Sequence, residues 1–266
     1  MSPISVTMLG TASAVPFSDR NPSAQALSVR GRLYLLDCGE GTQQRIRQEH
    51  LSFVKIQAIF ITHTHGDHIF GLYGLLSTMS LYHRSEALRI VGPADLGPVI
   101  DFFKGSFGAD LSYPVEFTPI CPEEPQEVYA DGDIRVKAFP LNHGIPCYGY
   151  LVEEEVGQRR EPWKPRTYAY CTDTAPFPEL PQWIAGVDVL YHEATYPQQY
   201  ADKARQYLHS TTLDAATTAL KAGVGQLLIG HYSSRVKDIS IFEQECRTIF
   251  AGTKAVNDGD IIEITR

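Results

Sequence analysis

The segment THTHGDH, residues 62–68, holds three histidines and one aspartate. It directly follows the apolar run IQAIFI, residues 56–61, and a continuous apolar run of this length is expected for a buried β-strand. Residues two apart in an extended segment face the same side of the chain. His63 and His65 can therefore contact one cation together.

The rest of the segment adds ligands of the same kind. We expect Gly66 to let the chain turn, so that Asp67 and His68 point from the start of the next helix toward a second position. Neutral imidazole and carboxylate groups suit Zn²⁺, and Mn²⁺ and Fe are also compatible. The alternative is a surface cluster of histidines or a run of capping residues, but the density of ligand types favours a metal site.

Three further candidate ligands each come shortly after a predicted strand. They are His143 after residues 134–139, Asp173 after residues 167–171 and His231 after residues 226–229. Strand exits are where α/β folds build their sites. Each residue alone would be interpreted as a turn residue or a capped histidine. Together with the first segment they supply about the number of ligands that two metal ions need.

The predicted elements alternate between strands and helices. We expect strands over residues 6–9, 26–29, 33–36, 56–61, 88–91, 115–119, 127–129, 134–139, 148–152, 167–171, 187–191, 226–229, 254–256 and 261–264. We expect helices over residues 42–49, 69–81, 96–103, 211–222 and 239–250. Thr211 with Asp214 predicts a capping box at the start of one helix, and Gly223 predicts its end. No repeat or linker divides the chain, so residues 1–266 are expected to form a single α/β domain.

Composition narrows the class of protein. Hydrophobic residues are 43% and charged residues 20% of the chain, as in globular proteins. The net charge of −8 argues against a broad basic surface for nucleic acid, but not against a local one or a site made positive by metal ions. Five scattered cysteines without a CxxC pair predict reduced thiols and a cytoplasmic protein. We expect neither a membrane span nor a signal peptide.

The segment EEEVGQRREPWKPR, residues 153–166, is charged and joins two predicted strands. The simple interpretation is an exposed hairpin loop. The alternative is a small contact arm whose basic side chains meet a phosphate backbone. Those side chains are Arg159, Arg160, Lys164 and Arg166.

The order of the candidate ligands resembles that of the metallo-β-lactamase superfamily. In detail it resembles the ribonuclease Z branch, the tRNA 3′-end endonucleases. The matching stretches are LGTASAVPFSDRNPSA, LLDCGEGTQQRI, ITHTHGDHIFGLYGLL, VGPADL, LNHGIPCYGY, YCTDT, YHEATY, HST and GHYSSR, and they cover most of the chain. HxHxDH is specific only for the superfamily, whereas its combination with DCGEGTQ, HEAT, HST and GHYSSR is specific for the branch.

The resemblance implies an αββα sandwich, in which two mixed sheets lie face to face with helices outside and the site at one sheet edge. It implies that His63, His65 and His143 hold one metal, that Asp67, His68 and His231 hold the other, and that Asp173 bridges the two. It also implies that Asp37 orients a ligand imidazole. The matched loops contain further candidates for phosphate contact, namely Ser13, Asn21, Ser234 and Arg235.

The same resemblance implies the chemistry. Two divalent ions about 3.5–4 Å apart, Zn²⁺ or alternatively Mn²⁺, can share a hydroxide that attacks phosphorus. Asp67 is placed to take a proton from the bridging water. The resemblance assigns protonation of the leaving alkoxide to His209, oriented by Glu193; from spacing alone they would be a capping neighbour and a strand-end carboxylate. His192 is expected to point the other way, into the structure.

The substrate remains open at this point. The first hypothesis is a zinc phosphodiesterase that removes 3′ trailers from tRNA precursors, as a homodimer. Many bacterial members of the branch carry a long tRNA-holding arm between the third histidine and the bridging aspartate, whereas only 29 residues separate His143 from Asp173 here. The second hypothesis keeps the metals but takes a small phosphodiester or cyclic nucleotide. A metal-bound scaffold without turnover is disfavoured, because every ligand position holds a competent side chain.

Overall fold

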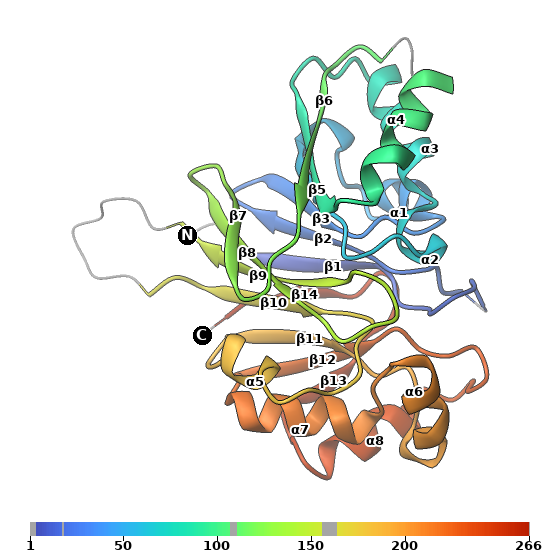
Figure 1. The fold of residues 1–266 in the computed structure, drawn as a ribbon, viewed down its shortest axis with the longest axis vertical. Helices are drawn as coiled ribbons and strands as arrows, with labels where there is room; N and C mark the ends of the chain where they lie inside the picture. Colours follow the sequence, from blue (N-terminus) through green and yellow to red (C-terminus); the bar gives the residue numbers. More distant parts are fainter. Residues whose placement is uncertain (1–3, 18, 107–110, 156–163, 266) are drawn as a thin grey trace.

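Two mixed β-sheets lie face to face with helices on both outer sides in the computed structural model (Figure 1). The model describes residues 4–17, 19–106, 111–155 and 164–265. The predicted αββα sandwich is confirmed. Within these ranges no helix combines the length and apolar character needed to cross a bilayer. The residues Arg159 and Arg160, which we considered as part of a contact arm, lie outside the described ranges.

The first sheet has seven strands in the order β14-β1-β2-β3-β4-β5-β6. Their bounds are β1 Ser5–Gly10, β2 Ala24–Val29, β3 Arg32–Leu36, β4 Ile56–Phe60, β5 Leu88–Pro93, β6 Val115–Ile120 and β14 Ile261–Glu263. From β14 to β3 neighbouring strands are antiparallel, and from β3 to β6 they are parallel. The last strand of the chain therefore completes the sheet that the first strand begins.

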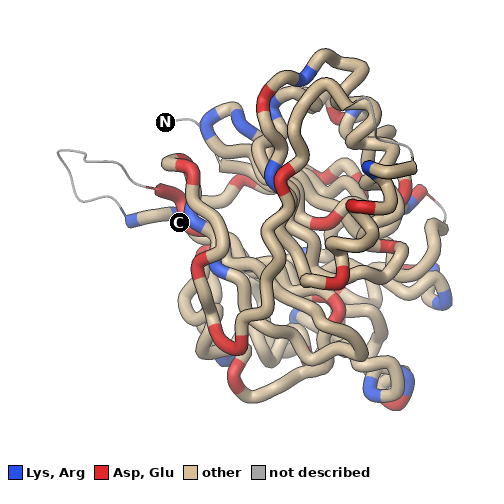
Figure 2. Tube along the Cα trace, turned by 45° about the horizontal axis from the view of Figure 1, so that its top comes forward, with Lys and Arg blue, Asp and Glu red and all other residues tan. Residues whose placement is uncertain are grey.

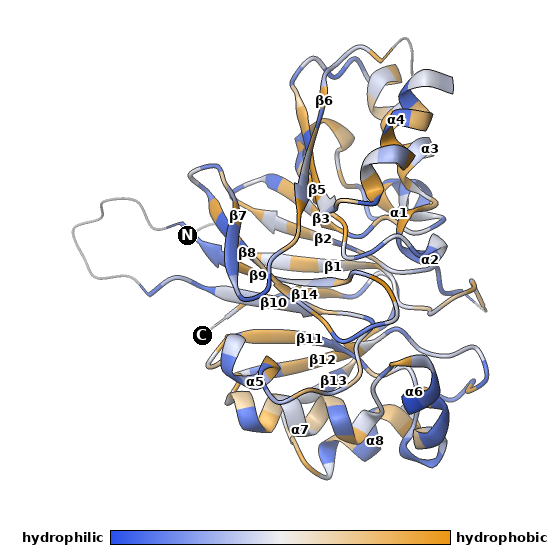
Figure 3. Ribbon diagram, viewed as in Figure 1, coloured by the Kyte–Doolittle hydropathy of each residue, from blue (hydrophilic) through white to orange (hydrophobic). Residues whose placement is uncertain are grey.

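The second sheet has seven strands in the order β13-β12-β11-β10-β9-β8-β7. Their bounds are β7 Gln126–Ala130, β8 Ile134–Pro140, β9 Tyr148–Glu154, β10 Thr167–Cys171, β11 Val189–Glu193, β12 Gln226–Gly230 and β13 Thr253–Ala255. Strands β7 to β10 are antiparallel, and β10 to β13 are parallel. In Figure 3, β11 and β12 are coloured as hydrophobic, as expected for parallel strands that are covered on both faces.

Helices cover the outer face of each sheet. Their bounds are α1 Thr42–Gln48, α2 Gly66–Ile69, α3 Leu72–Leu81, α4 Leu96–Ser106, α5 Leu180–Trp183, α6 Ala201–Tyr207, α7 Thr212–Ala222 and α8 Ser240–Arg247, with short 3₁₀ helices at Phe53–Lys55 and Gln198–Tyr200. One apolar core fills the space between the two sheets. A second core lies between the first sheet and its helices, and a third lies between the second sheet and its helices. This packing holds the two sheets in place relative to each other, so that residues at one edge of both sheets can form a common polar site.

The observed elements differ from the predicted ones mainly in three places, and several other boundaries shift by one to three residues. The helix expected over residues 69–81 is two helices, α2 and α3, and the buried side chains of α3 make it a core helix. Strand β11 begins and ends two residues later than expected, so it includes Glu193. Helices α5 and α6 were not predicted at all. The predicted capping box of Thr211 and Asp214 is confirmed, as is the left-handed Gly223 that ends α7.

Candidate metal centre

Side chains that follow strands of both sheets meet at one edge of the sandwich. Asp37 follows β3, residues 62–68 follow β4, His143 follows β8, Asp173 follows β10, Glu193 ends β11 and His231 follows β12. Parallel strands direct their carboxyl ends to a common edge, which explains why residues so distant in sequence converge here. A cavity of about 700 Å³ opens over them, a volume typical of ligand sites.

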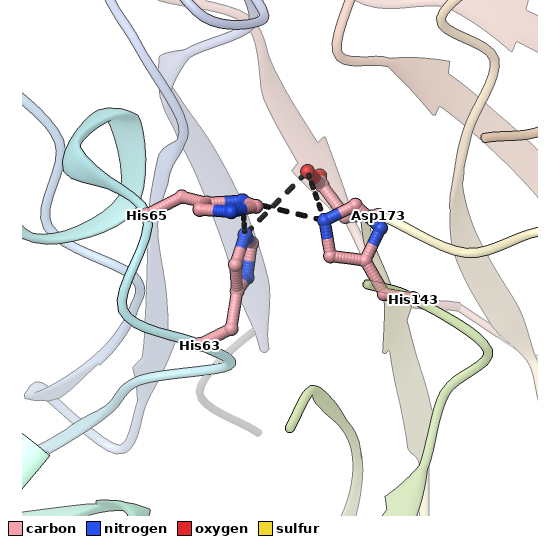
Figure 4. A group of neighbouring side chains, drawn as sticks. All are labelled: His63, His65, His143 and Asp173. Carbon is pink, nitrogen blue, oxygen red and sulfur yellow. Dashed lines mark hydrogen bonds and ion pairs between the residues drawn. The ribbon is translucent and has the colours of Figure 1, made fainter. Parts of the chain in front are cut away.

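A first group of ligand atoms gathers around His65 (Figure 4). The His65 Nδ1 lies 3.0 Å from the His63 Nε2 and 3.3 Å from the His143 Nε2. The Asp173 Oδ2 lies 3.5 Å from the His63 Nε2 and 3.7 Å from the His143 Nε2. Figure 4 shows that His63 and His65 come from one loop and His143 from another, with their rings turned toward a common point.

A second group lies on the other side of the Asp173 carboxylate. The Asp173 Oδ1 is 3.4 Å from the His68 Nε2 and 3.0 Å from the His231 Nε2. The Asp67 Oδ2 is 3.5 Å from the His68 Nε2 and 3.6 Å from the His231 Nε2. The two oxygens of Asp173 thus face the two groups separately, and the structure brings together all seven side chains that the sequence singled out as metal ligands.

Hydroxyl and carbonyl groups determine which ring nitrogen of each histidine is left free to bind a metal ion. The Thr62 hydroxyl donates to Asp37 and lies 3.0 Å from the His63 Nδ1, so it accepts from that nitrogen. The Leu208 carbonyl lies 3.2 Å from the His143 Nδ1 and can only accept. In both rings Nδ1 carries the hydrogen, and the lone pair of Nε2 points into the group.

The second group is arranged by the same logic. The Thr195 hydroxyl donates to Glu193 and lies 2.8 Å from the His231 Nδ1. The Asp37 Oδ2 lies 2.8 Å from the His68 Nδ1. Because these partners occupy Nδ1, the buried Nε2 atoms of His68 and His231 are left without a hydrogen-bond partner. Buried nitrogens with free lone pairs aimed at carboxylates fit a cation at this point.

The electrostatics of the centre also favour a cation. Burial would lower the pKa of His68, but the carboxylates of Asp67 and Asp173 outweigh burial and raise that pKa well above its usual value. Burial would raise the pKa of Asp173, but the imidazoles around it hold that pKa well below its usual value. Burial, together with His68, lowers the pKa of His63 to about 4. Without a cation, protons on imidazoles such as His68 offset these carboxylates, and a divalent ion bound here would displace those protons.

His209 and Glu193 form a second polar pair beside the ligand cluster. The His209 Nδ1 lies 2.8 Å from the Glu193 Oε1, and His209 lines the cavity. Glu193 also accepts the backbone N–H groups of Thr174 and Thr195. Burial would lower the pKa of His209, but Glu193 outweighs it and raises that pKa to about 9. The pair is therefore an imidazolium held by a carboxylate.

Other expectations meet mixed outcomes. Ser13, Ser234 and Arg235 line the cavity. Asn21 does not: its backbone N–H donates to Asp258 and its side chain lies against Gly41. Gly66 is the first residue of helix α2, so the chain turns there from the extended His65 into the helix, as expected, but without a left-handed backbone.

His192 is buried, and its Nδ1 is 2.7 Å from the Glu193 carbonyl oxygen, so it points into structure as expected. Arg166, one of the four basic residues considered for a contact arm, makes a two-point ion pair with Glu154. Its guanidinium is therefore already paired within the protein. Arg166 directly precedes β10, whereas Asp173 follows the opposite end of that strand.

The sequence reasoning missed the residues that orient the ligands. Thr62 and Thr195 each stand next to or near a candidate ligand, but the contacts of Thr62 with Asp37 and of Thr195 with His231 depend on the neighbouring strand of the same sheet. Leu208 acts through its carbonyl, for which no side-chain type is required. The backbone N–H of Ala14 donates to the Asp67 Oδ2 at 2.7 Å. The LGTASAV motif, which contains Ala14, was the sequence feature that could have indicated this contact.

Comparison with known sequences agrees with this geometry. The family model of the β-lactamase superfamily domain matches residues 32–232. The chain is 35% identical to the Ribonuclease Z of Porphyromonas gingivalis, over 298 positions that cover 97% of this chain and 98% of that protein. It is 36% identical to the Ribonuclease Z of Ignicoccus hospitalis, with 94% of this chain and 95% of that protein covered.

Solved structures show the same likeness. Human tRNase Z, short form, superposes with a TM-score of 0.82 at 31% identity, covering 98% of this chain and all of that one. A diphosphatase of the PhnP family superposes with a TM-score of 0.72 at 20% identity, covering 98% of this chain and 97% of that one. The second match, at its low identity, indicates the shared fold alone.

Proposed function

This chain belongs to the ribonuclease Z family within the β-lactamase superfamily, and we propose that it is a metal-dependent endoribonuclease that removes 3′ trailers from tRNA precursors. The observation that carries the proposal is the convergence of seven imidazole and carboxylate ligands beside the His209–Glu193 pair. An array of this kind has the donors for two cations and a separate proton donor, a combination suited to metal-assisted phosphodiester hydrolysis.

The ligand set divides naturally between two metal positions. We assign His63, His65 and His143 to one, Asp67, His68 and His231 to the other, and Asp173 to both. A set rich in imidazole suits Zn²⁺, and Mn²⁺ is the alternative. When bound, two such ions supply an activated water and neutralise charge on the phosphate oxygens.

The protein residues then move and hold protons. Asp67, placed by the Ala14 N–H, is the carboxylate that accepts a proton from the attacking water. His209 donates a proton to the leaving oxygen, and Glu193 fixes the ring through Nδ1 so that Nε2 serves the substrate. Asp37 holds His68 in the tautomer that leaves Nε2 free. Arg235, at the wall of the cavity, supplies positive charge for a flanking phosphate.

A cytoplasmic homodimer completes the proposal. Five unpaired cysteines support a reducing compartment. Leu81 and Tyr82, 78% and 53% exposed at the end of α3, support a self-association surface. Light scattering of the wild type and of Leu81→Asp tests this part: a dimer that the substitution makes monomeric is expected, and a monomeric wild type contradicts it.

A second candidate function is hydrolysis of a small phosphodiester or cyclic nucleotide at the same centre. It is favoured by the short connection from Glu154 to Thr167, which leaves little room for a tRNA-holding arm. The alignment with the Porphyromonas protein is longer than this chain, so that relative carries residues that are absent here. Red and blue segments are also interspersed in Figure 2, without a continuous basic band on the coloured chain in that view.

One experiment separates the two functions. The purified protein is analysed for bound metal and incubated with a 3′-extended tRNA and with bis(p-nitrophenyl) phosphate, and the products are sized. Cleavage of the tRNA at one position near its 3′ end is the expected result. Hydrolysis of the small diester alone would favour the second candidate. His65→Ala is expected to lose both metal and rate, and a fully metallated, active variant would refute the ligand assignment.

A further inference from the structure

Two exposed aromatic rings lie at the wall of the cavity that holds the ligand cluster. Phe70 is 71% exposed and Tyr207 is 52% exposed, and both line the cavity together with His65 and His209. An exposed aromatic ring at the wall of a site offers a flat face on which a nucleotide base can stack. We propose that Phe70 and Tyr207 are stacking platforms for the two nucleotide bases that flank the scissile phosphodiester, an inference that rests on the proposed function.

Phe70 lies next to the candidate ligands. It caps the C-terminal end of α2, the helix that presents Asp67 and His68. Its ring lies directly on the backbone of Gly66: a Cβ at that position would come within 2.3 Å of two ring atoms. Gly66 therefore serves to admit the ring. The ring therefore lies over the chain between His65 and Asp67, at the edge of the ligand cluster.

Tyr207 is placed on the other side of the centre by backbone geometry. It is the last residue of α6, and the next residue, Leu208, adopts a left-handed φ of 55°. This turn directs the Leu208 carbonyl to His143 and brings His209 to Glu193. Tyr207 is thus tied to the segment that carries the proton donor, which is the side of the leaving oxygen.

Base stacking is the chemistry that suits these rings. Every base has a π-face, so an aromatic platform holds single-stranded RNA without regard to sequence. The two platforms belong to different elements, with Phe70 beside Asp67 and Tyr207 beside His209. The base joined to the leaving oxygen is therefore assigned to Tyr207, and the base on the opposite side of the phosphate to Phe70.

The test uses 3′-extended tRNA with 2-aminopurine on one or the other side of the cleavage site. The metal-loaded enzyme is mixed with it in a stopped-flow instrument, and stacking quenches the fluorescence before product forms. Phe70→Leu is expected to abolish the quench on the side away from the leaving oxygen, and Tyr207→Leu on the leaving side. Each should raise KM by about 5- to 100-fold with kcat little changed.

Matched controls separate stacking from general effects. Tyr207→Phe keeps the ring and is expected to keep the quench. Phe102→Leu removes a ring that is 59% exposed on α4 and should leave quench and KM unchanged. Unchanged quench and KM in both Leu variants, while the wild type cleaves tRNA, would overturn the inference and leave the function intact. A wild type that cleaves no RNA would overturn both.

Discussion

At the residue scale, the sharpest assignment is that of His209. Its Nδ1 is committed to Glu193, so Nε2 is the atom that can protonate a leaving alkoxide. We expect His209→Ala to slow cleavage of 3′-extended tRNA by about 10²- to 10³-fold. Hydrolysis of bis(p-nitrophenyl) phosphate should fall much less, because nitrophenolate leaves without a proton. Equal losses on the two substrates, measured as kcat/KM, would remove His209 from this role.

Single residues also show what the sequence can and cannot reveal about a site. The convergence of the candidate ligands was predictable, because imidazole and carboxylate at strand exits have few other uses in such numbers. Thr62 and Thr195 were not, because a threonine beside a ligand is common. The contact of Thr62 with Asp37 exists only when β3 lies next to β4, and that of Thr195 with His231 only when β12 lies next to β11. The sequence reveals which side chains can bind a metal ion, whereas the tautomer of each histidine depends on residues that are close only in the folded structure.

At the element scale, helix α7 has a start that can be tested directly. The Thr211 hydroxyl accepts from the Asp214 N–H, and the Asp214 carboxylate accepts from the Thr211 N–H. We expect Thr211→Ala to lower the free energy of unfolding by about 1 kcal/mol, measured by urea denaturation. Thr217→Ala, inside the same helix, is the control and should change it by less than about 0.5 kcal/mol. Equal changes would contradict the capping role.

The predicted and missed elements differ in how they pack. Strands β4 and β12 and helix α7 bury much of their surface, so their apolar patterns were visible in the sequence. Helix α6 buries only Ala204 among its seven residues, and Figure 3 shows it as hydrophilic. A helix without an apolar stripe has no periodic signal, and so the segment that carries Tyr207 was missed.

At the scale of the whole molecule, Asp131 joins the two sheets. Its Oδ2 accepts the hydroxyl of Tyr34 in β3 and that of Tyr129 in β7, at 2.6 and 2.9 Å. Burial would raise the pKa of Asp131, but these hydrogen bonds, together with those from the backbone N–H groups of Asp133 and Ile134, outweigh it and lower that pKa below its usual 3.8. A carboxyl whose pKa is lowered by folding stabilises the native state above its unfolded pKa, and this contribution is lost as the pH falls.

We therefore expect the free energy of unfolding to decrease as the pH falls through 4 toward 3, partly through Asp131. Asp131→Asn removes the titrating group and should make this pH dependence shallower, as followed by denaturation at a series of pH values. Lys137→Met, on the second sheet, is a control for an unrelated charge change. An unaltered slope in Asp131→Asn would show that the sheet-to-sheet contact does not depend on the carboxylate charge.

Metal binding should also stabilise the whole molecule, because its ligands come from both sheets. Each ion present at about 100 times its Kd adds about 2.7 kcal/mol to the free energy of unfolding, so two ions add about 5 kcal/mol. For a chain of this size we expect chelation of both ions to lower the melting temperature by about 10–20 °C, and Zn²⁺ to restore it. Scanning calorimetry with and without chelator measures this, and a melting temperature indifferent to chelation would count against a bound metal.

The ligand-bearing loops are spread along the chain from the end of β4 to the end of β12. A ribosome therefore has to synthesise most of the polypeptide before the last candidate ligand, His231, emerges from the exit tunnel. Until then the nascent protein holds an incomplete set of donors. Under the proposed function, a half-made copy cannot cut the RNA around it, and nuclease activity begins only when the two halves have closed on each other.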